Sequence, residues 1–282
     1  MCEFCIKHGE GEKWYLQAKN YAEDLLSDMK RRRMIEGFSK MDIGTIREKI
    51  GQLDRLHRMP AFVRRVITRR ITKKMKKQHF GQVVPIEEIE RILGFVNSIV
   101  RVGCICRKIG TGKEQRFCYG VSMGPNGGEF AKLFKEISPD FLSGPDALST
   151  ESLTKEEALS AMREHEKEGL CHTVWTFRTP FIGGICNCDR ADCLALKTTL
   201  THGITTLFRG EYVAEVDPEA CVGCRACMRV CQFGAMAYSA GEKKTVVDRR
   251  HCYGCGICRS VCPKNAIVLH DRADTADVAE VW

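Results

Sequence analysis

The sequence has no run of apolar residues that approaches the roughly 20 consecutive ones of a membrane-spanning helix. Its first residues, Met1-Cys2-Glu3-Phe4-Cys5, do not have the basic and then apolar segments of a signal peptide. It also has no glycine-rich G-x-G-x-x-G or G-x-x-x-x-G-K-[ST] loop, and no Ser/His/Asp set stands out. These absences argue against a membrane span, export, a nucleotide or flavin site and a serine-type hydrolase.

The composition is that of an ordinary folded chain. Of the 282 residues, 44% are hydrophobic and 28% are charged, which excludes collagen, a coiled coil and bulk disorder. The length is enough for about two domains. We expect an α+β protein, because helical and strand-like patterns both occur along the chain.

Cysteine is the residue that stands out. There are 17 cysteines, an odd number and a lower density than in a small disulfide-stabilised scaffold. Because no export signal points to an oxidising compartment, we expect a reducing cytoplasm in which thiolates bind metal.

The net positive charge comes entirely from the first third of the chain. Residues 1–103 contain 22 Lys and Arg against 13 Asp and Glu, a net charge of +9, and the remainder has a net charge of −1. A basic segment of this kind is typical of a surface that meets an acidic partner such as a protein, a nucleic acid or lipid headgroups.

Residues 1–84 are predicted to form a basic helical region. Apolar residues recur at roughly helical spacing between Trp14 and Lys30. The segment from Arg58 to Lys77 contains nine Lys and Arg and no acidic residue, with apolar side chains every three to four positions. We interpret this segment as an amphipathic helix that packs its apolar stripe on the body. Docking of an acidic partner protein is the main alternative, and contact with a membrane surface or a nucleic acid is a minor one.

Residues 85–210 are predicted to form a central domain of helices and strands. Helices are expected after Pro85 and from Phe130 to Ile137, and a strand from Ile99 to Cys106. Thr154 and Glu157 form a capping box that starts a third helix, which Gly169 ends. A half-buried strand follows over 171–179. Helix, strand, turn and strand in this order suggest a winged-helix-like subdomain.

Residues 211–282 contain an internal repeat. A run with the spacing C-x-x-C-x-x-C-x-x-x-C occurs twice, 31 residues apart, and predicted strands flank each copy. The cysteines are Cys221, Cys224, Cys227, Cys231, Cys252, Cys255, Cys258 and Cys262. Three thiolates of one short loop can surround three corners of a cubane cluster, and the fourth cysteine follows on a helical turn that points away.

These paired runs resemble the bacterial-type ferredoxins that bind two [4Fe–4S] clusters. The resemblance implies a pseudo-twofold module with two small hairpins and short helices. It also implies crossed ligation, in which one cluster is held by Cys221, Cys224, Cys227 and Cys262, and the other by Cys252, Cys255, Cys258 and Cys231. Gly223 and Gly254 would let backbone N–H groups approach the clusters.

The two cysteine runs differ in the residue that follows their last cysteine. Gln232 stands where the family usually has the proline that Pro263 supplies in the second run, which affects a local turn and one cluster's potential but no ligand. The alternative to the clusters is a pair of zinc sites, and the repeated three-plus-one grouping favours cubanes over zinc.

Six further cysteines form two C-x-C pairs, each with an outlying third cysteine, in the central region. If both pairs lie on strands, each pair points to one side. Cys193 is expected to start a helix, where the thiol pKa falls. We predict a third metal site, either an iron–sulfur cluster or zinc, and a redox-active dithiol or packed thiols are the alternatives. The cysteines are Cys104, Cys106, Cys118, Cys186, Cys188 and Cys193.

Three further predictions concern the N-terminal cysteines, Cys171 and the histidine next to the second run. Cys2, Cys5 and His8 are three residues apart and offer three ligands, with an unliganded pair as the equal alternative. Cys171 is expected to be a packed thiol. His251 either tunes the cluster next to it or, as we favour, lies in a solvated turn.

We therefore predict an electron-transfer protein, a ferredoxin-like subunit or carrier that passes single electrons to or from a partner oxidoreductase. The resemblance suggests anaerobic metabolism. One alternative is an enzyme whose central cysteine site has an open coordination position. Another is a redox-sensing regulator whose basic helices bind nucleic acid, which would give a salt-dependent shift of a DNA duplex.

Overall fold

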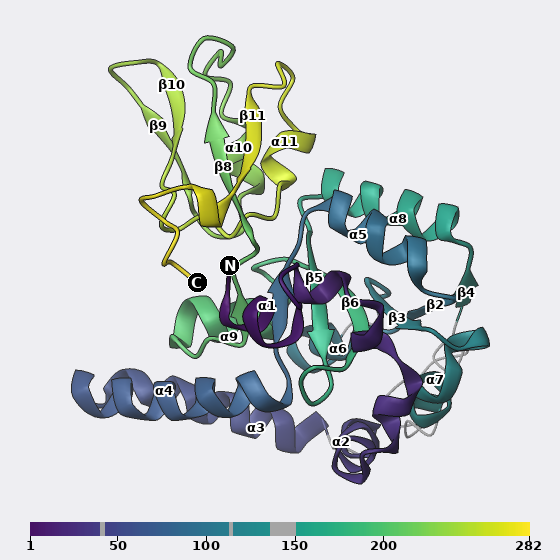
Figure 1. Ribbon diagram of the computed structural model, residues 1–282. Coiled ribbons are helices and arrows are strands. Elements are labelled where there is room, and N and C mark those ends of the chain that lie inside the picture. The colour runs from purple at the N-terminus through teal and green to yellow at the C-terminus, as the bar shows by residue number, and fades with distance from the viewer. Residues whose placement is uncertain (40–42, 113–114, 136–150) are drawn as a thin grey trace.

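The computed structural model describes residues 1–39, 43–112, 115–135 and 151–282. Figure 1 shows a body built around one sheet, a long helix along the lower edge of the body, and a C-terminal lobe above it. Among the described residues, no helix combines the length and the apolar character that a membrane crossing requires.

The N-terminal segment is helical only in part. Its α-helices are α1 (Glu3–His8), α2 (Met29–Ser39), α3 (Ile43–Asp54) and α4 (Ala61–Gln78). Between and after them lie short 3₁₀ turns, which are η1 (Trp14–Leu16), η2 (Ala18–Tyr21), η3 (Glu23–Ser27) and η4 (Arg55–Arg58).

The single helix expected between Trp14 and Lys30 is wrong. Side chains occupy the carbonyls that a helix would use, because Asn20 Nδ2 donates to Trp14 O at 2.7 Å and Tyr21 OH donates to Tyr15 O at 2.7 Å. The aromatic side chains of this segment are fully buried in the main core of the body. Tertiary burial of these large rings therefore overrides the helical spacing of the sequence.

The predicted basic helix is present as α4, but its packing differs from our interpretation. None of its residues is buried, and Phe62 and Val66 are 73% and 50% exposed. The apolar stripe therefore rests on the body only in part, and the basic face is open to solvent.

The body contains a seven-stranded sheet in the order β4-β2-β3-β6-β5-β1-β7. All neighbours are antiparallel except the pair β1 and β7. The strands are β1 (Gly81–Val83), β2 (Ser98–Val102), β3 (Cys118–Ser122), β4 (Glu151–Leu153), β5 (Cys171–Thr176), β6 (Ile182–Cys188) and β7 (Leu207–Phe208).

The sheet corrects three expectations. A winged-helix-like subdomain does not describe it, because the predicted strand pair is the centre of a sheet of seven. The strand β5 is buried at every position rather than half-buried, since it lies between β6 and β1 with both faces covered. Finally, β1 and the N-terminal aromatic residues share one core with this sheet, so a boundary near residue 84 would divide that core.

Helices surround the sheet. The capping box at Thr154 is confirmed, with Glu157 N donating to Thr154 Oγ1 at 3.2 Å and Thr154 N donating to Glu157 Oε2 at 2.8 Å. The strand expected over 99–106 ends at Val102, and a helix begins at Ile105. The elements are α5 (Ile86–Phe95), α6 (Ile105–Thr111), η5 (Pro125–Gly127), α7 (Gly128–Lys135), α8 (Lys155–Lys167) and α9 (Leu194–His202).

The C-terminal lobe consists of two antiparallel strand pairs and short helical segments. Only one pair is a hairpin, β9 with β10, because the other joins the first strand of the lobe, β8, to the last, β11. Its elements are β8 (Tyr212–Val216), α10 (Ala226–Val230), β9 (Met236–Ser239), β10 (Lys244–Val247), α11 (Ile257–Ser260), β11 (Ile267–Asp271) and η6 (Arg272–Asp274).

Two glycines occupy equivalent positions in the cysteine runs. Gly223 and Gly254 have φ values of 65° and 72°, in the left-handed region that favours glycine. A Cβ atom on either would lie 2.2 Å from a backbone carbonyl oxygen, that of Lys243 or that of Tyr212. The repeat therefore extends from the cysteine spacing to the backbone conformation.

Candidate metal centres

The two cysteine runs meet inside the C-terminal lobe. One cavity is lined by three cysteines of the first run and one of the second, which are Cys221, Cys224, Cys227 and Cys262. Pro263 and Thr245 complete part of its wall. The fold thus brings together thiols that are up to 41 residues apart in the sequence.

The other four cysteines of the lobe are more deeply placed. Cys252, Cys255 and Cys258 are buried, and Cys231 is half-buried. Burial is the main reason that the pKa values of Cys255 and Cys258 are raised. Cys231 lies close enough for its charge to contribute to the raised pKa of Cys252 and of Cys258.

Backbone amides point at the sulfurs in a repeated pattern. Ala235 N donates to Cys231 Sγ at 3.3 Å, and Ala266 N donates to Cys262 Sγ at 3.3 Å. Each donor follows its cysteine by four residues, so the pattern has the same period as the repeat. Such N–H···S bonds stabilise negative charge on a group bound by these sulfurs.

The spacing of these thiols fits a cluster better than a single ion. Thiolates on one tetrahedral zinc ion lie about 4 Å apart, given Zn–S bonds of about 2.3 Å. In the part of the chain that the structure describes, the only three ligand atoms mutually within 4.8 Å belong to Cys2, Cys5 and Glu211, outside the lobe. The donor set of the lobe, eight cysteine thiols, is that of iron–sulfur ligation.

The six central cysteines also come together. Cys104 Sγ and Cys118 Sγ are 3.3 Å apart, and Cys118 lies opposite Cys186 on the neighbouring strand. Cys193 forms hydrogen bonds with both Cys106 and Cys188. The charges of the first three thiols also affect those of Cys106, Cys188 and Cys193. The six thiols therefore form one group, which we call the central thiol group.

One of the two C-x-C pairs of the central thiol group is positioned differently from our expectation. Cys186 and Cys188 are alternate residues of β6 and share a face of the sheet, as predicted. Cys104 and Cys106 do not lie on a strand, because Cys104 is the N-cap of α6 and Cys106 is in its first turn. Helix geometry, not strand alternation, places these two thiols.

Cys193 is the most acidic thiol of the group. It is the N-cap residue of α9, as predicted. Hydrogen bonds from Cys106 and Cys188, followed by those from the backbone amides of Leu196 and Ala195, lower its pKa well below the ordinary range. Its two thiol partners have raised pKa values in consequence, first through the bond to Cys193 and then through burial.

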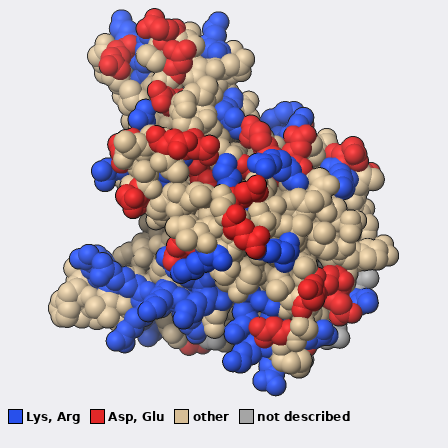
Figure 2. Space-filling view, viewed as in Figure 1, with Lys and Arg blue, Asp and Glu red and all other residues tan. Residues whose placement is uncertain are grey.

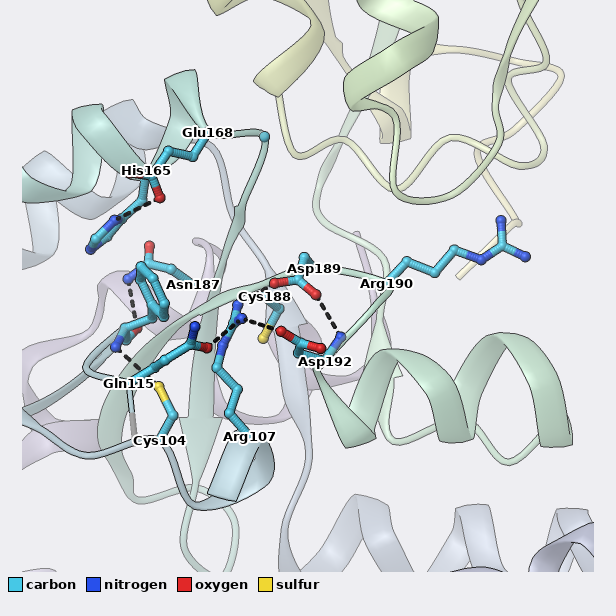
Figure 3. Close-up of polar contacts among 12 residues, drawn as sticks. Cys104, Arg107, Gln115, His165, Glu168, Asn187, Cys188, Asp189, Arg190 and Asp192 are labelled. Carbon is cyan, nitrogen blue, oxygen red and sulfur yellow. Dashed lines mark hydrogen bonds and ion pairs between the residues drawn. The ribbon is translucent and has the colours of Figure 1, made fainter. Parts of the chain in front are cut away.

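A buried guanidinium lies beside the central thiol group (Figure 3). Arg107 is 5% exposed and is paired with Asp189 and, at 3.1 Å, with Asp192. The guanidinium lies over the ring of Phe117, 4.4 Å from the ring centroid. The backbone N of Phe117 donates to Cys104 Sγ at 3.0 Å. The pairing holds the loop before α9 against α6 and so positions thiols from both elements.

The central thiol group adjoins the C-terminal lobe. Cys188 and Cys193 belong to the same buried cluster as Tyr253, Cys255 and Ile257 of the lobe. Cys171, the predicted packed thiol, is fully buried in this cluster, and burial is the main cause of its raised pKa. One cysteine run therefore packs directly against the body.

Gln232, which replaces the family's usual proline, links the two parts. Its Oε1 accepts a hydrogen bond of 2.7 Å from Arg190 N, and its Nε2 donates to Gly169 O at 2.6 Å. A proline could form neither bond. The sequence marked this position as a departure, but nothing in the sequence indicated its partners.

The two smaller predictions have different outcomes. Cys2 and Cys5 are brought together, but the third group beside them is Glu211 and not His8. The side chain of His251 is 69% exposed and its Nδ1 lies 2.7 Å from Asp248 Oδ2, which is the solvated turn that we favoured.

Comparison with known families covers one part of the chain. A family model described as a 4Fe-4S dicluster domain matches residues 214–269, which include both cysteine runs. A search of the curated proteins finds no match. The C-terminal part thus contains a ferredoxin-type 4Fe–4S domain, and the match does not extend to residues 1–213.

Proposed function

We propose that the protein transfers single electrons between a partner oxidoreductase and a centre within its own body. The observation that carries the proposal is the pair of identically spaced cysteine runs in one lobe, with thiols of both runs around one cavity. Iron–sulfur clusters bound there would accept and release one electron each with little rearrangement.

The ligands are assigned by crossed ligation. Three cysteines of each run and the last cysteine of the other run would hold one cluster. The cavity lined by Cys221, Cys224, Cys227 and Cys262 supports the first set. The second set is Cys252, Cys255, Cys258 and Cys231, whose charges influence one another in the protein interior.

The central thiol group is proposed to hold a third centre, an iron–sulfur cluster. Most of its thiols are disfavoured as thiolates by burial and by one another, so the group needs positive charge before more than one can ionise. Arg107 supplies part of that charge at its edge, where its own carboxylate partners hold it. A metal cluster would supply the rest.

The arrangement supports an electron path with a direction. The Cys224 thiol is exposed and Val222 beside it is 58% exposed, so the first run meets solvent. The second run is buried against the body, where Cys255 shares a cluster with Cys188 and Cys193. We therefore place the exchange with a partner near Cys224 and the inner end of the path at the central thiol group.

Helix α4 is proposed as a docking surface for an acidic partner protein. Figure 2 shows lysine and arginine gathered along the lower edge of this face, where α4 lies in Figure 1. Among the residues of α4, all of which the structure describes, only Lys76 forms an ion pair, with Glu3. Raising the ionic strength should therefore slow association with such a partner more than the electron transfer that follows. A reducing cytoplasm and an anaerobic metabolism suit this function.

The enzyme alternative is less well supported. It requires a cluster with an open coordination position, and three cysteines around the central site would have favoured it. The central thiol group contains six, which are more than a cubane needs. We therefore keep the central site as a carrier of electrons.

Iron and acid-labile sulfide analysis of anaerobically purified protein tests the proposal. Because each cubane holds four irons, we expect about twelve irons per chain, or about eight if only the C-terminal lobe is loaded. Electron paramagnetic resonance after reduction should show interacting [4Fe–4S] signals. Colourless protein, or zinc in place of iron and sulfide, would refute the proposal.

A further inference from the structure

A buried group of two thiols and one carboxylate lies apart from both sets of cysteines described above. Cys2 Sγ is 3.5 Å from Cys5 Sγ, and Cys5 Sγ is 2.9 Å from Glu211 Oε1. All three ligand atoms lie within 4.8 Å of one another. The residues are 3%, 0% and 2% exposed, so all three side chains are shielded from bulk water.

The group joins two ends of the sequence. Cys2 is the N-cap of α1 and Cys5 follows one turn later on the same face. Glu211, more than 200 residues further on, directly precedes β8, the first strand of the C-terminal lobe. Phe4 holds α1 in place by stacking on Phe80, with ring centroids 4.2 Å apart.

The group has no paired cation in the part of the chain that the structure describes. Among the described residues, no lysine or arginine forms an ion pair with Glu211. The buried guanidinium of Arg272 interacts with the charge of Glu211 but donates its hydrogen bonds to the carbonyls of Gly210, Tyr212 and Cys252.

A second observation points to a missing ligand. The hydroxyl of Tyr15 is fully buried and has no hydrogen-bond partner in the described part of the chain. Tyr15 belongs to the same buried cluster as Cys2 and Cys5, so this hydroxyl lies in the interior that surrounds the group. A buried hydroxyl without a hydrogen-bond partner is destabilising, so a ligand or a bound water that accepts or donates there is favoured.

We propose that Cys2, Cys5 and Glu211 bind one zinc ion. Two thiolates and a carboxylate are ordinary zinc ligands, and a site with three protein ligands takes a water as the fourth. The Tyr15 hydroxyl would then form a hydrogen bond with that water. Binding of Zn²⁺ releases the two thiol protons, so the net charge of the site stays at −1, the charge of one carboxylate and two neutral thiols.

The role of this ion is to tie the N-terminus to the start of the C-terminal lobe. Zinc has no redox chemistry of its own, so the site stands outside the electron path. A dithiol that exchanges with other proteins is a poor alternative, because both thiols are buried and a carboxylate completes the set. The inference does not depend on the proposed function.

The test is zinc analysis of the cluster-containing protein, purified without oxygen and dialysed against a buffer with limiting zinc. We expect one zinc per chain. X-ray absorption at the zinc edge should show two sulfur ligands at about 2.3 Å and oxygen ligands at about 2.0–2.2 Å. Glu211→Gln and Cys5→Ser should each weaken zinc binding at least tenfold, whereas the iron content should not change.

The matched control is His8→Gln, which removes the ligand that the sequence alone suggested. It should retain zinc at the wild-type affinity. Since Cys5→Ser removes a buried side chain, Glu211→Gln with wild-type iron content and circular dichroism is the decisive variant. The proposal fails if that folded variant keeps its zinc affinity, if the zinc has four sulfur ligands, or if mass spectrometry finds a Cys2–Cys5 disulfide.

Discussion

The C-terminal runs and the central thiol group both gather cysteines, but they do so in opposite ways. In the lobe each run spans 11 residues, and a repeated glycine turn and N–H···S pattern position its thiols. The central six are spread over 90 residues and come from two helix starts and two strands. Local spacing builds the first arrangement, and only the folded sheet builds the second.

This difference explains what each arrangement is suited to. A short loop with glycine and amide donors can surround a cluster almost independently of the rest of the chain, so the same motif occurs in many proteins. The central thiol group depends on α6, β3, β6 and α9 being packed together, with Arg107 holding two of them. Its stability is therefore that of the whole body.

The largest expected effect comes from Cys258→Ser. We expect the loss of about four irons, because one cubane of the lobe loses a ligand, while any signal from the central site remains. Iron analysis and electron paramagnetic resonance measure both. Loss of the central signal as well would show that the two arrangements are not separate.

The complementary variant is Cys193→Ser, with Cys171→Ser as the control. Cys193 is bonded to two thiols of the central thiol group, so its loss should remove the third centre and leave about eight irons in the lobe. Cys171 is a buried thiol of the same cluster outside the six, and its variant should keep all irons. Equal iron loss in the two variants would contradict the assignment.

A smaller effect is expected from Gln232→Leu at the junction. This change removes two hydrogen bonds between the lobe and the body, each worth about 0.5–1.5 kcal/mol. Urea unfolding should show a lower free energy of unfolding, by about 1–3 kcal/mol. Gln52→Leu on the exposed face of α3 serves as the control and should change little. If both variants unfold alike, Gln232 does not couple the two parts.

The smallest effect concerns the pH dependence near the same junction. Burial raises the pKa of Glu166 to about 7, and the charge of Glu87 adds to it. The folded state therefore favours the protonated carboxyl, and this stability is complete below the unfolded-state pKa and is lost as the pH rises through about 7.

Glu166→Gln should remove that loss, because the amide does not titrate. Relative to the wild type, the variant should gain stability between pH 6 and 8, with little difference at pH 5, as measured by thermal unfolding. An identical difference at all three pH values would show that the carboxyl of Glu166 is not what titrates.

Much of the C-terminal lobe could be predicted from the sequence. Spacing, the repeat and the glycines are local properties, so they survive without knowledge of the fold. The turn of Gln232 toward Arg190 and Gly169 could not be predicted, because both partners lie more than 40 residues away. The helix between Trp14 and Lys30 failed for the same reason, since burial of its aromatic rings outweighs a weak local preference.

By itself, the sequence determined the repeated spacing of the C-terminal thiols, because spacing within one loop is set by covalent geometry and a few backbone angles. Only the tertiary structure decided which distant groups meet. Glu211 rather than His8 joins Cys2 and Cys5, and six scattered thiols form one group. Contacts between distant residues are chosen by how the buried sheet and its helices pack, and no local pattern records that choice.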